Sequence, residues 1–187
     1  MRFSMGNVFK GKAFGRFEFT AATLVLALSA RPALAEYPVT TLATLLDRVQ
    51  IEDMLVEYYG NLGAGHRDFG SFYTEDGVLD VNGIESRGKK AIDDLYAKLE
   101  QPSPMPRGTL HMLLTNPVIR VDGDSATAEV VWTGIISDAV KAPPRLVEQG
   151  RERDELVKLG GHWFIKHRWI TSDSGLPTMF EKTYKQR

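Results

Sequence analysis

The apolar residues of this chain change their spacing once, near Thr109, and that change limits the folds open to it. Between residues 41 and 62 they recur every three or four positions, the pattern of a helix with one buried face. Beyond residue 109 the chain consists of long β-prone runs joined by glycine-containing turns or a proline-containing loop, which predicts antiparallel strands. These runs are 110–121, 125–137, 147–159 and 162–171.

Shorter elements are expected between the long helix and the long strands. Residues 68–73 and 88–100 have helical spacing, and residues 78–81 form a short β-prone run. Three prolines within residues 101–107 predict a loop. The expected order is helix, short helix, strand, helix and four long strands, which is an α+β plan.

Residues 1–35 have the features of a cleaved secretory signal peptide. A basic start precedes an apolar run over residues 19–30, and Ala33-Leu34-Ala35 supplies the small residues of a cleavage site. We expect cleavage after Ala35, export to the periplasm or the medium, and no membrane association of the mature chain. Residues 36–174 then form one domain, and residues 175–187 form a polar C-terminal tail.

The composition narrows the classes of function. The chain has 23 Lys and Arg residues against 24 Asp and Glu residues, so no basic surface for nucleic acid is expected. Without cysteine there is no disulfide, thiolate metal site or cysteine nucleophile. The four histidines are too widely spaced for a zinc motif, and the glycines lack the context of a nucleotide-binding loop. We therefore expect neither a metal nor a cofactor.

Several segments resemble the SnoaL-like branch of the nuclear-transport-factor-two-like superfamily. The stretches Arg107–Asn116 and Val121–Ala128 resemble the histidine-bearing strand of that branch and the hairpin after it. The stretches Gly150–Leu156 and Gly161–Ile165 resemble its closing hairpin. The resemblance implies a cone-shaped, curved antiparallel sheet wrapped around a long N-terminal helix, with an internal pocket. Relatives include polyketide cyclases, dehydratases, steroid isomerases, a dehydrochlorinase, diarylpropane lyases and pure ligand-binding modules.

The resemblance implies a catalytic role for His111, which lies in the apolar run Leu110-His-Met-Leu-Leu114. A histidine near neutral pKa can accept a proton and return it to a leaving group. The aspartate that usually orients this histidine is replaced by Gly63. Tyr59 lies one helical turn before Gly63 and on the same face, so it is a second catalytic candidate, whereas Tyr58 is a weaker candidate for substrate binding.

Two carboxyl groups alternate along the third long strand. Glu152 and Asp154 fall on the stripe of Leu156, which is expected to be concave and inward. A buried carboxyl there could orient His111, or act as the base itself if burial raises its pKa. The alternative is a solvated strand edge, because the run is highly charged.

Aromatic residues are expected to line the pocket. Trp132 lies on an inward stripe of the second long strand. On the last strand, His167 and Trp169 share the stripe of Trp163 and Ile165, which places Arg168 on the opposite stripe. Such groups would bind a flat aromatic ligand, although a sheet core of this size can contain them for packing alone.

These residues suggest a cofactor-independent lyase for a small hydroxylated aromatic substrate, such as a lignin-derived diaryl compound. It would dehydrate the substrate or cleave a carbon–carbon bond by elimination, with or without loss of formaldehyde. An isomerase or cyclase in the same pocket, or an exported binding protein without catalysis, are the alternatives. We also expect a homo-oligomer, a dimer or trimer, formed through the outer sheet face. That face contains Thr127, Val131, Thr133 and Ile135.

Overall fold

A computed structural model describes residues 40–66, 68–99 and 108–175. The predicted signal peptide, the loop 101–107 and the tail beyond Gly175 lie outside the described residues. Within the described part of the chain, no helix is both long and apolar enough to span a membrane.

The described elements have the α+β order that the sequence predicts. One strand was not predicted, β2, and β1 begins well before the short run that was expected. The elements in chain order are α1 (Leu42–Ala64), the 3-10 helix η1 (Phe69–Phe72), β1 (Tyr73–Val81), β2 (Ile84–Arg87), α2 (Lys89–Leu99), β3 (Thr109–Asp122), β4 (Ser125–Ser137), β5 (Arg145–Leu159) and β6 (His162–Ser174).

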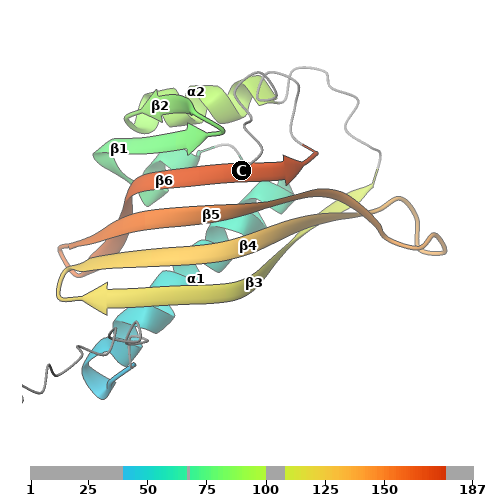
Figure 1. Ribbon diagram of the computed structural model, residues 1–187. Coiled ribbons are helices and arrows are strands. Elements are labelled where there is room, and N and C mark those ends of the chain that lie inside the picture. Colours follow the sequence, from blue (N-terminus) through green and yellow to red (C-terminus); the bar gives the residue numbers. More distant parts are fainter. Residues whose placement is uncertain (1–39, 67, 100–107, 176–187) are drawn as a thin grey trace, which may run out of the picture. The chain divides into compact units, whose positions relative to one another are not determined.

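The six strands of the described residues belong to one curved, open sheet, in the order β2-β1-β6-β5-β4-β3 (Figure 1). The two predicted hairpins, β3–β4 and β5–β6, are present, and β4 pairs antiparallel with β5. The expectation of an antiparallel sheet needs one correction, because β1 pairs in parallel with β6. This pairing places the last strand between the first strand and the meander of β3, β4 and β5.

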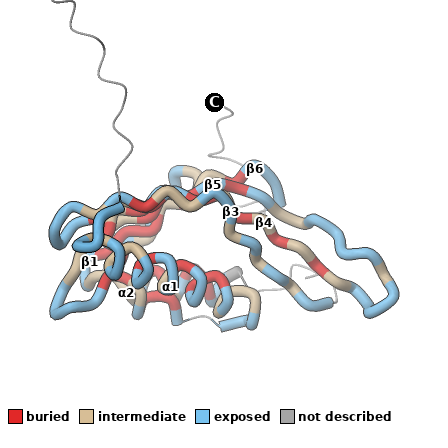
Figure 2. The backbone as a smooth tube through the Cα atoms, turned by 90° about the horizontal axis from the view of Figure 1, so that it is seen from below, coloured by how far each residue is buried: buried red, intermediate tan, exposed pale blue. Residues whose placement is uncertain are grey.

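Helix α1 has a defined start, a defined end and one buried face. The Thr41 side chain accepts a hydrogen bond from the Thr44 backbone and the Thr44 side chain accepts one from the Thr41 backbone, which is a capping box. Gly65 ends the helix in the left-handed conformation, with φ of 85°. Figure 2 shows α1 and α2 on one side of the sheet, with buried residues where α1 and the sheet meet. The buried residues of α1 are Ile51, Leu55, Tyr58 and Tyr59.

Strand alternation decides which side chains of the sheet face α1. In β4 the buried positions include Ala126, Ala128, Val130 and Trp132. Strand β5 pairs with β4 in a continuous register from 148 to 157, and its buried positions are Gly150, Glu152, Asp154 and Leu156. Both predicted carboxyl groups therefore lie on the inner face of the sheet rather than at a solvated edge.

A β-bulge in β6 reverses its alternation. Ile165 pairs with Leu156, but His167 rather than Lys166 pairs with Glu155, so Lys166 is an extra residue in β6. Beyond Lys166 the inward positions are therefore shifted by one residue. Arg168 is fully buried, whereas His167 is only partly buried.

Candidate functional site

A buried ion pair forms the centre of the candidate site. Asp154 of β5 and Arg168 of β6 are directly opposite each other in the sheet. Arg168 Nε donates to Asp154 Oδ1 at 2.8 Å, and Arg168 Nη2 donates to Asp154 Oδ2 at 3.1 Å. Both side chains are fully buried. This bidentate arrangement occupies both carboxylate oxygens of Asp154, so its role is to hold Arg168.

Glu152 is a second carboxyl beside the same cation and is only 4% exposed. Its Oε1 lies 3.5 Å from Arg168 Nη2, and its Oε2 accepts a hydrogen bond from the Tyr59 hydroxyl. One buried guanidinium cannot neutralise two buried carboxylates, and Asp154 holds it with the better geometry. Burial raises the pKa of Glu152 to about 8, against the attraction of Arg168 and with the help of Asp154. Glu152 is therefore protonated at neutral pH.

Four buried tyrosine side chains surround the ion pair. The Arg168 guanidinium carbon lies 4.0 Å from the centre of the Tyr58 ring, a cation–π contact. The Tyr58 hydroxyl hydrogen-bonds to the hydroxyls of Tyr73 and Tyr96. Burial raises the pKa of all four phenols, those of Tyr58, Tyr59, Tyr73 and Tyr96, well above their usual value. They therefore remain neutral and can serve as hydrogen-bond donors.

Three buried polar atoms of this cluster lack a hydrogen-bond partner within the described residues. They are Trp132 Nε1, Glu152 Oε1 and Arg168 Nη1. Leaving a buried donor or acceptor unsatisfied costs about 1–3 kcal/mol, so such atoms are usually paired with solvent or a ligand. Trp132 and Arg168 supply N–H donors, and a protonated Glu152 supplies an O–H donor. The three together are suited to a ligand that carries oxygen atoms.

The structure corrects the placement of His111. Its backbone pairs with Ile135, and its side chain is exposed on the face of β3 opposite Met112 and Leu114, which pack against the core. His111 is therefore not brought together with Tyr59 or the carboxyl groups.

The expected pocket positions of His167 and Trp169 are also wrong. The bulge at Lys166 turns both side chains to the outer face, where their rings stack with centroids 3.5 Å apart. Arg153, which also faces outward, lies over the Trp169 ring at 5.5 Å. The same shift turns Arg168 inward, so the sequence pattern missed the cation at the centre of the site.

The other predicted site residues lie in the core. Tyr59 contacts Glu152 directly, and Tyr58 contacts Arg168 instead of lining open space. Trp132 is buried on the inner face of β4. Its ring lies over Gly150, where a Cβ atom would come within 2.7 Å of Trp132 Cε2.

Close packing accounts for glycine at position 63. A Cβ atom on Gly63 would lie 3.2 Å from the Leu110 carbonyl oxygen of β3. Helix α1 thus approaches the backbone of β3 more closely than a larger residue allows. The position that the family resemblance assigns to an aspartate is a helix–strand contact in this chain.

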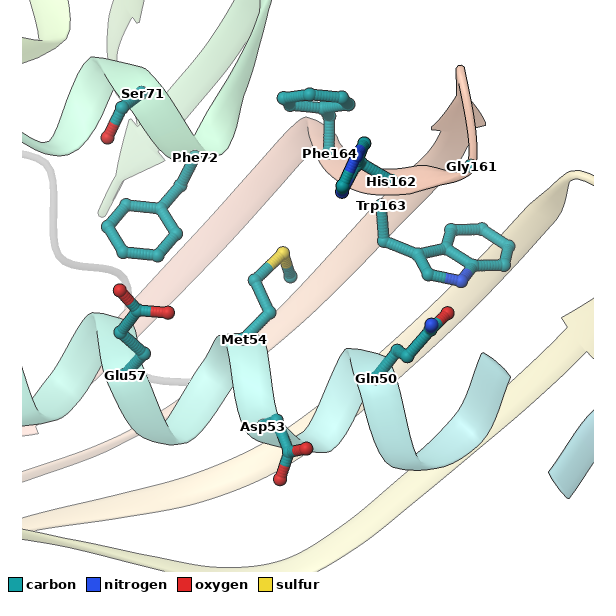
Figure 3. Close-up of a pocket in the computed structure, with 10 residues that line it drawn as sticks. All are labelled: Gln50, Asp53, Met54, Glu57, Ser71, Phe72, Gly161, His162, Trp163 and Phe164. Atoms are coloured by element: carbon teal, nitrogen blue, oxygen red, sulfur yellow. The ribbon is translucent and has the colours of Figure 1, made fainter. Parts of the chain in front are cut away.

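A separate groove of about 390 Å³ lies between α1, η1 and the start of β6 (Figure 3). None of the predicted site residues lines it. One of its lining residues, Phe72, contacts the buried tyrosines, because the rings of Phe72 and Tyr58 meet edge to face at 5.1 Å. The lining residues are Gln50, Asp53, Met54, Glu57, Ser71, Phe72, Gly161, His162, Trp163 and Phe164.

The donor groups at the buried site are carboxyl, phenol, guanidinium and indole. Among the described residues, no group of three or more His, Asp or Glu side chains is arranged to hold a metal ion. The chemistry that these groups can perform is proton transfer and hydrogen bonding.

Together, the fold and the site define a class: an α+β protein whose curved sheet packs on a long first helix and carries acid–base groups between them. The SnoaL-like domain family matches residues 43–169, and the chain belongs to that family. No protein in the curated set compared with it matches the sequence.

Solved structures with the same fold share little sequence with this chain. A Nostoc punctiforme protein of unknown function with a cystatin-like fold has a TM-score of 0.61 and 22% identity, over 72% of this chain and 96% of that one. A provisionally assigned scytalone dehydratase from Novosphingobium aromaticivorans has a TM-score of 0.58 and 18% identity, over 72% and 91%. The beta subunit of a provisionally assigned aromatic-ring-hydroxylating dioxygenase from the same organism has a TM-score of 0.60 and 18% identity, over 74% and 97%.

Proposed function

We propose that this protein is a cofactor-independent lyase that acts on a small hydroxylated aromatic compound by elimination, and that this elimination is a dehydration. The observation that carries the proposal is Glu152. It is a buried carboxyl that retains its proton at neutral pH, beside donors that lack partners among the described residues. A general acid of this kind can protonate a leaving hydroxyl group.

In the proposed mechanism, Glu152 transfers its proton to a benzylic hydroxyl of the substrate. The carbon–oxygen bond breaks, and its electron pair leaves with the oxygen as water. The Glu152 carboxylate then accepts a proton from the adjacent carbon, and the electrons of that carbon–hydrogen bond form the new double bond. Glu152 is thereby returned to its protonated state, so the reaction needs no external acid or base.

The neighbours of Glu152 would stabilise its transient carboxylate. The Tyr59 hydroxyl already donates to Oε2, and Arg168 Nη2 is 3.5 Å from Oε1. Trp132 Nε1 would donate a hydrogen bond to a substrate oxygen. Tyr59 thus keeps the role in catalysis that its position on α1 suggests, and Glu152 takes the proton-transfer role that the family resemblance implies for His111.

Family membership supports an elimination reaction without deciding it. The provisionally assigned scytalone dehydratase shares the fold with this chain, and its name denotes the loss of water from scytalone. Because one fold hosts many activities, the choice rests on the site rather than on this likeness.

The test is to incubate the purified protein with phenolic compounds that carry a benzylic hydroxyl, and to follow product mass and ultraviolet absorbance. We expect a product lighter by one water, with a new long-wavelength band from the extended conjugation. Glu152→Gln should lower kcat by about 100-fold or more, and Tyr59→Phe by about 10-fold. Glu155→Gln, next to this cluster on the same strand, is the matched control and should retain activity.

The outcome also separates the alternatives. A product of unchanged mass would contradict the lyase and favour an isomerase or cyclase. Binding without any conversion would favour an exported binding protein. Full activity in Glu152→Gln would overturn the mechanism even if a lyase activity were present.

We also retain export and homo-oligomerisation as proposals. Export rests on the signal-peptide features of residues 1–35. Self-association is supported by half-exposed side chains on the face of the sheet opposite α1. These side chains belong to Thr127, Val131, Thr133 and Ile135.

A further inference from the structure

Glu148 is a third carboxyl on the inner face of the sheet, and sequence reasoning did not identify it. It pairs with Gly134 of β4, and its side chain lies across that glycine. A Cβ atom on Gly134 would lie 2.8 Å from Glu148 Oε1 and would overlap its Cγ. Since Gly134 shares the inward stripe of Trp132 and Ile136, the Glu148 carboxyl lies on the inner face.

Nothing in the described residues neutralises or satisfies this carboxyl. Glu148 is half-buried, and no hydrogen bond or ion pair joins its carboxyl to another described residue. Burial raises the pKa of Glu148 above its usual value. A half-buried carboxyl without a protein partner is an available hydrogen-bonding group.

Glu148 and Glu152 lie on β5, one on each side of the position that the Trp132 ring of β4 covers. They are four residues apart in the uninterrupted part of β5, which separates their Cα atoms by about 13 Å. Gly150 lies midway between them, and the Trp132 indole covers it. The inner face therefore presents a carboxyl, an aromatic ring and a second carboxyl in a row.

We propose that Glu148 binds the end of the substrate that does not react, and that the substrate is an elongated aromatic compound with a hydroxyl group at each end. The inference rests on the proposed function for the placement of the reacting end at Glu152. The aromatic part would lie against Trp132, and the far hydroxyl would hydrogen-bond to Glu148. Glu148 is thus a specificity-determining residue, and Glu152 is the catalytic one.

The test compares two probes that differ by one hydroxyl: bis(4-hydroxyphenyl)methane, which has one at each end, and 4-benzylphenol, which has only one. Their affinities are measured by calorimetry with the purified protein. The wild type should bind the first probe about tenfold more tightly, the contribution of one good hydrogen bond. Glu148→Leu should reduce this ratio to about one and leave the affinity for 4-benzylphenol nearly unchanged.

Two further variants make the test independent of a folding defect. Gly134→Ala keeps the carboxyl but occupies the space in which Glu148 Cγ lies, so it should also reduce the ratio. Gln149→Leu changes the next residue of β5, whose side chain is exposed, and should keep the wild-type ratio. A wild type that does not distinguish the probes, or a Glu148→Leu variant that still does, would overturn the inference.

Because binding needs no turnover, the two proposals fail separately. A protein that prefers the two-hydroxyl probe through Glu148, yet converts no hydroxylated aromatic compound, contradicts the lyase and supports the role of Glu148. A protein that dehydrates its substrates, yet binds both probes equally, supports the lyase and contradicts the role of Glu148.

Discussion

The side chains of the buried site are arranged around one cation that is shared between two carboxyl groups. Arg168 is held by Asp154 through two hydrogen bonds and by Glu152 through a longer contact. The unequal geometry gives the two carboxyl groups different roles. Asp154 holds the cation, and Glu152, whose pKa is raised by burial, is the acid.

Removing the shared cation should destabilise the protein strongly. Arg168→Met leaves the fully buried Asp154 without a counter-charge, and we expect the free energy of unfolding to fall by about 3–5 kcal/mol in urea denaturation. Arg153→Met removes an exposed arginine of the neighbouring strand and should cost less than about 1 kcal/mol. An equal fall in the free energy of unfolding in the two variants would show that the buried Arg168–Asp154 pair stabilises the fold no more than an exposed arginine does.

The sequence identified part of this site for a definable reason. Glu152 and Asp154 lie in the part of β5 whose alternation continues without interruption, from residue 148 to residue 157, so their inward placement follows from their spacing to Leu156. His111 lies in a run that is apolar on both faces, and Leu113 on its outer face is 45% exposed. Such a run contains no alternation from which the face of the histidine could be determined.

One extra residue in strand β6 explains why the sequence pattern predicts the wrong face for the side chains that follow it. Lys166 interrupts the alternation of β6, so His167 and Trp169 face outward and Arg168 faces inward. A strand pattern read with an unbroken period of two assigns every residue after such a bulge to the wrong face. The α+β plan, the long first helix and both hairpins were predictable, because each depends on several residues rather than on one register.

Two glycines of α1 provide a matched test of how closely this helix packs on β3. Gly60 is exposed, and a Cβ atom there would meet nothing within 4 Å, so Gly60→Ala should stabilise the protein by about 0.5–1 kcal/mol. At Gly63 a Cβ atom would press on the Leu110 carbonyl, so Gly63→Ala should be less stable than Gly60→Ala by about 1 kcal/mol. Thermal unfolding of the two variants measures the difference. Equal stabilisation would mean that α1 and β3 are not in tight contact at this point.

The protonated carboxyl of Glu152 should make the stability of the whole folded protein depend on pH. The folded state holds a proton on Glu152 up to about pH 8, whereas the unfolded chain releases it near the ordinary glutamate value. Between these values the folded state binds more protons, so stability falls as pH rises. We expect the melting temperature of the wild type, relative to Glu152→Gln, to decrease between pH 5 and pH 8.

This comparison isolates Glu152 from the other titrating groups. The lowered pKa of the partly buried His167 acts with the opposite sign near pH 6.5, but His167 is present in both proteins. Its contribution therefore cancels in the difference between them. A difference that stays constant across this range would contradict a raised pKa for Glu152.

The half-exposed side chains on the outer face of the sheet predict self-association of the protein. Light scattering of the wild type at micromolar concentration should give the mass of a dimer or trimer. Val131→Lys places a charge on the half-exposed face and should lower that mass. A monomeric wild type would contradict self-association through this face, without bearing on the chemistry of the buried site.

The proposed mechanism depends on a proton that Glu152 holds inside the folded protein at neutral pH. Carbon-13 NMR titration of the glutamate side-chain carboxyl groups measures this directly, with Glu152→Gln used to assign the resonance. We predict a midpoint for Glu152 well above the ordinary glutamate value, near pH 8. A midpoint at or below that ordinary value would mean that Glu152 is a carboxylate at neutral pH, and the proposed general acid would be lost.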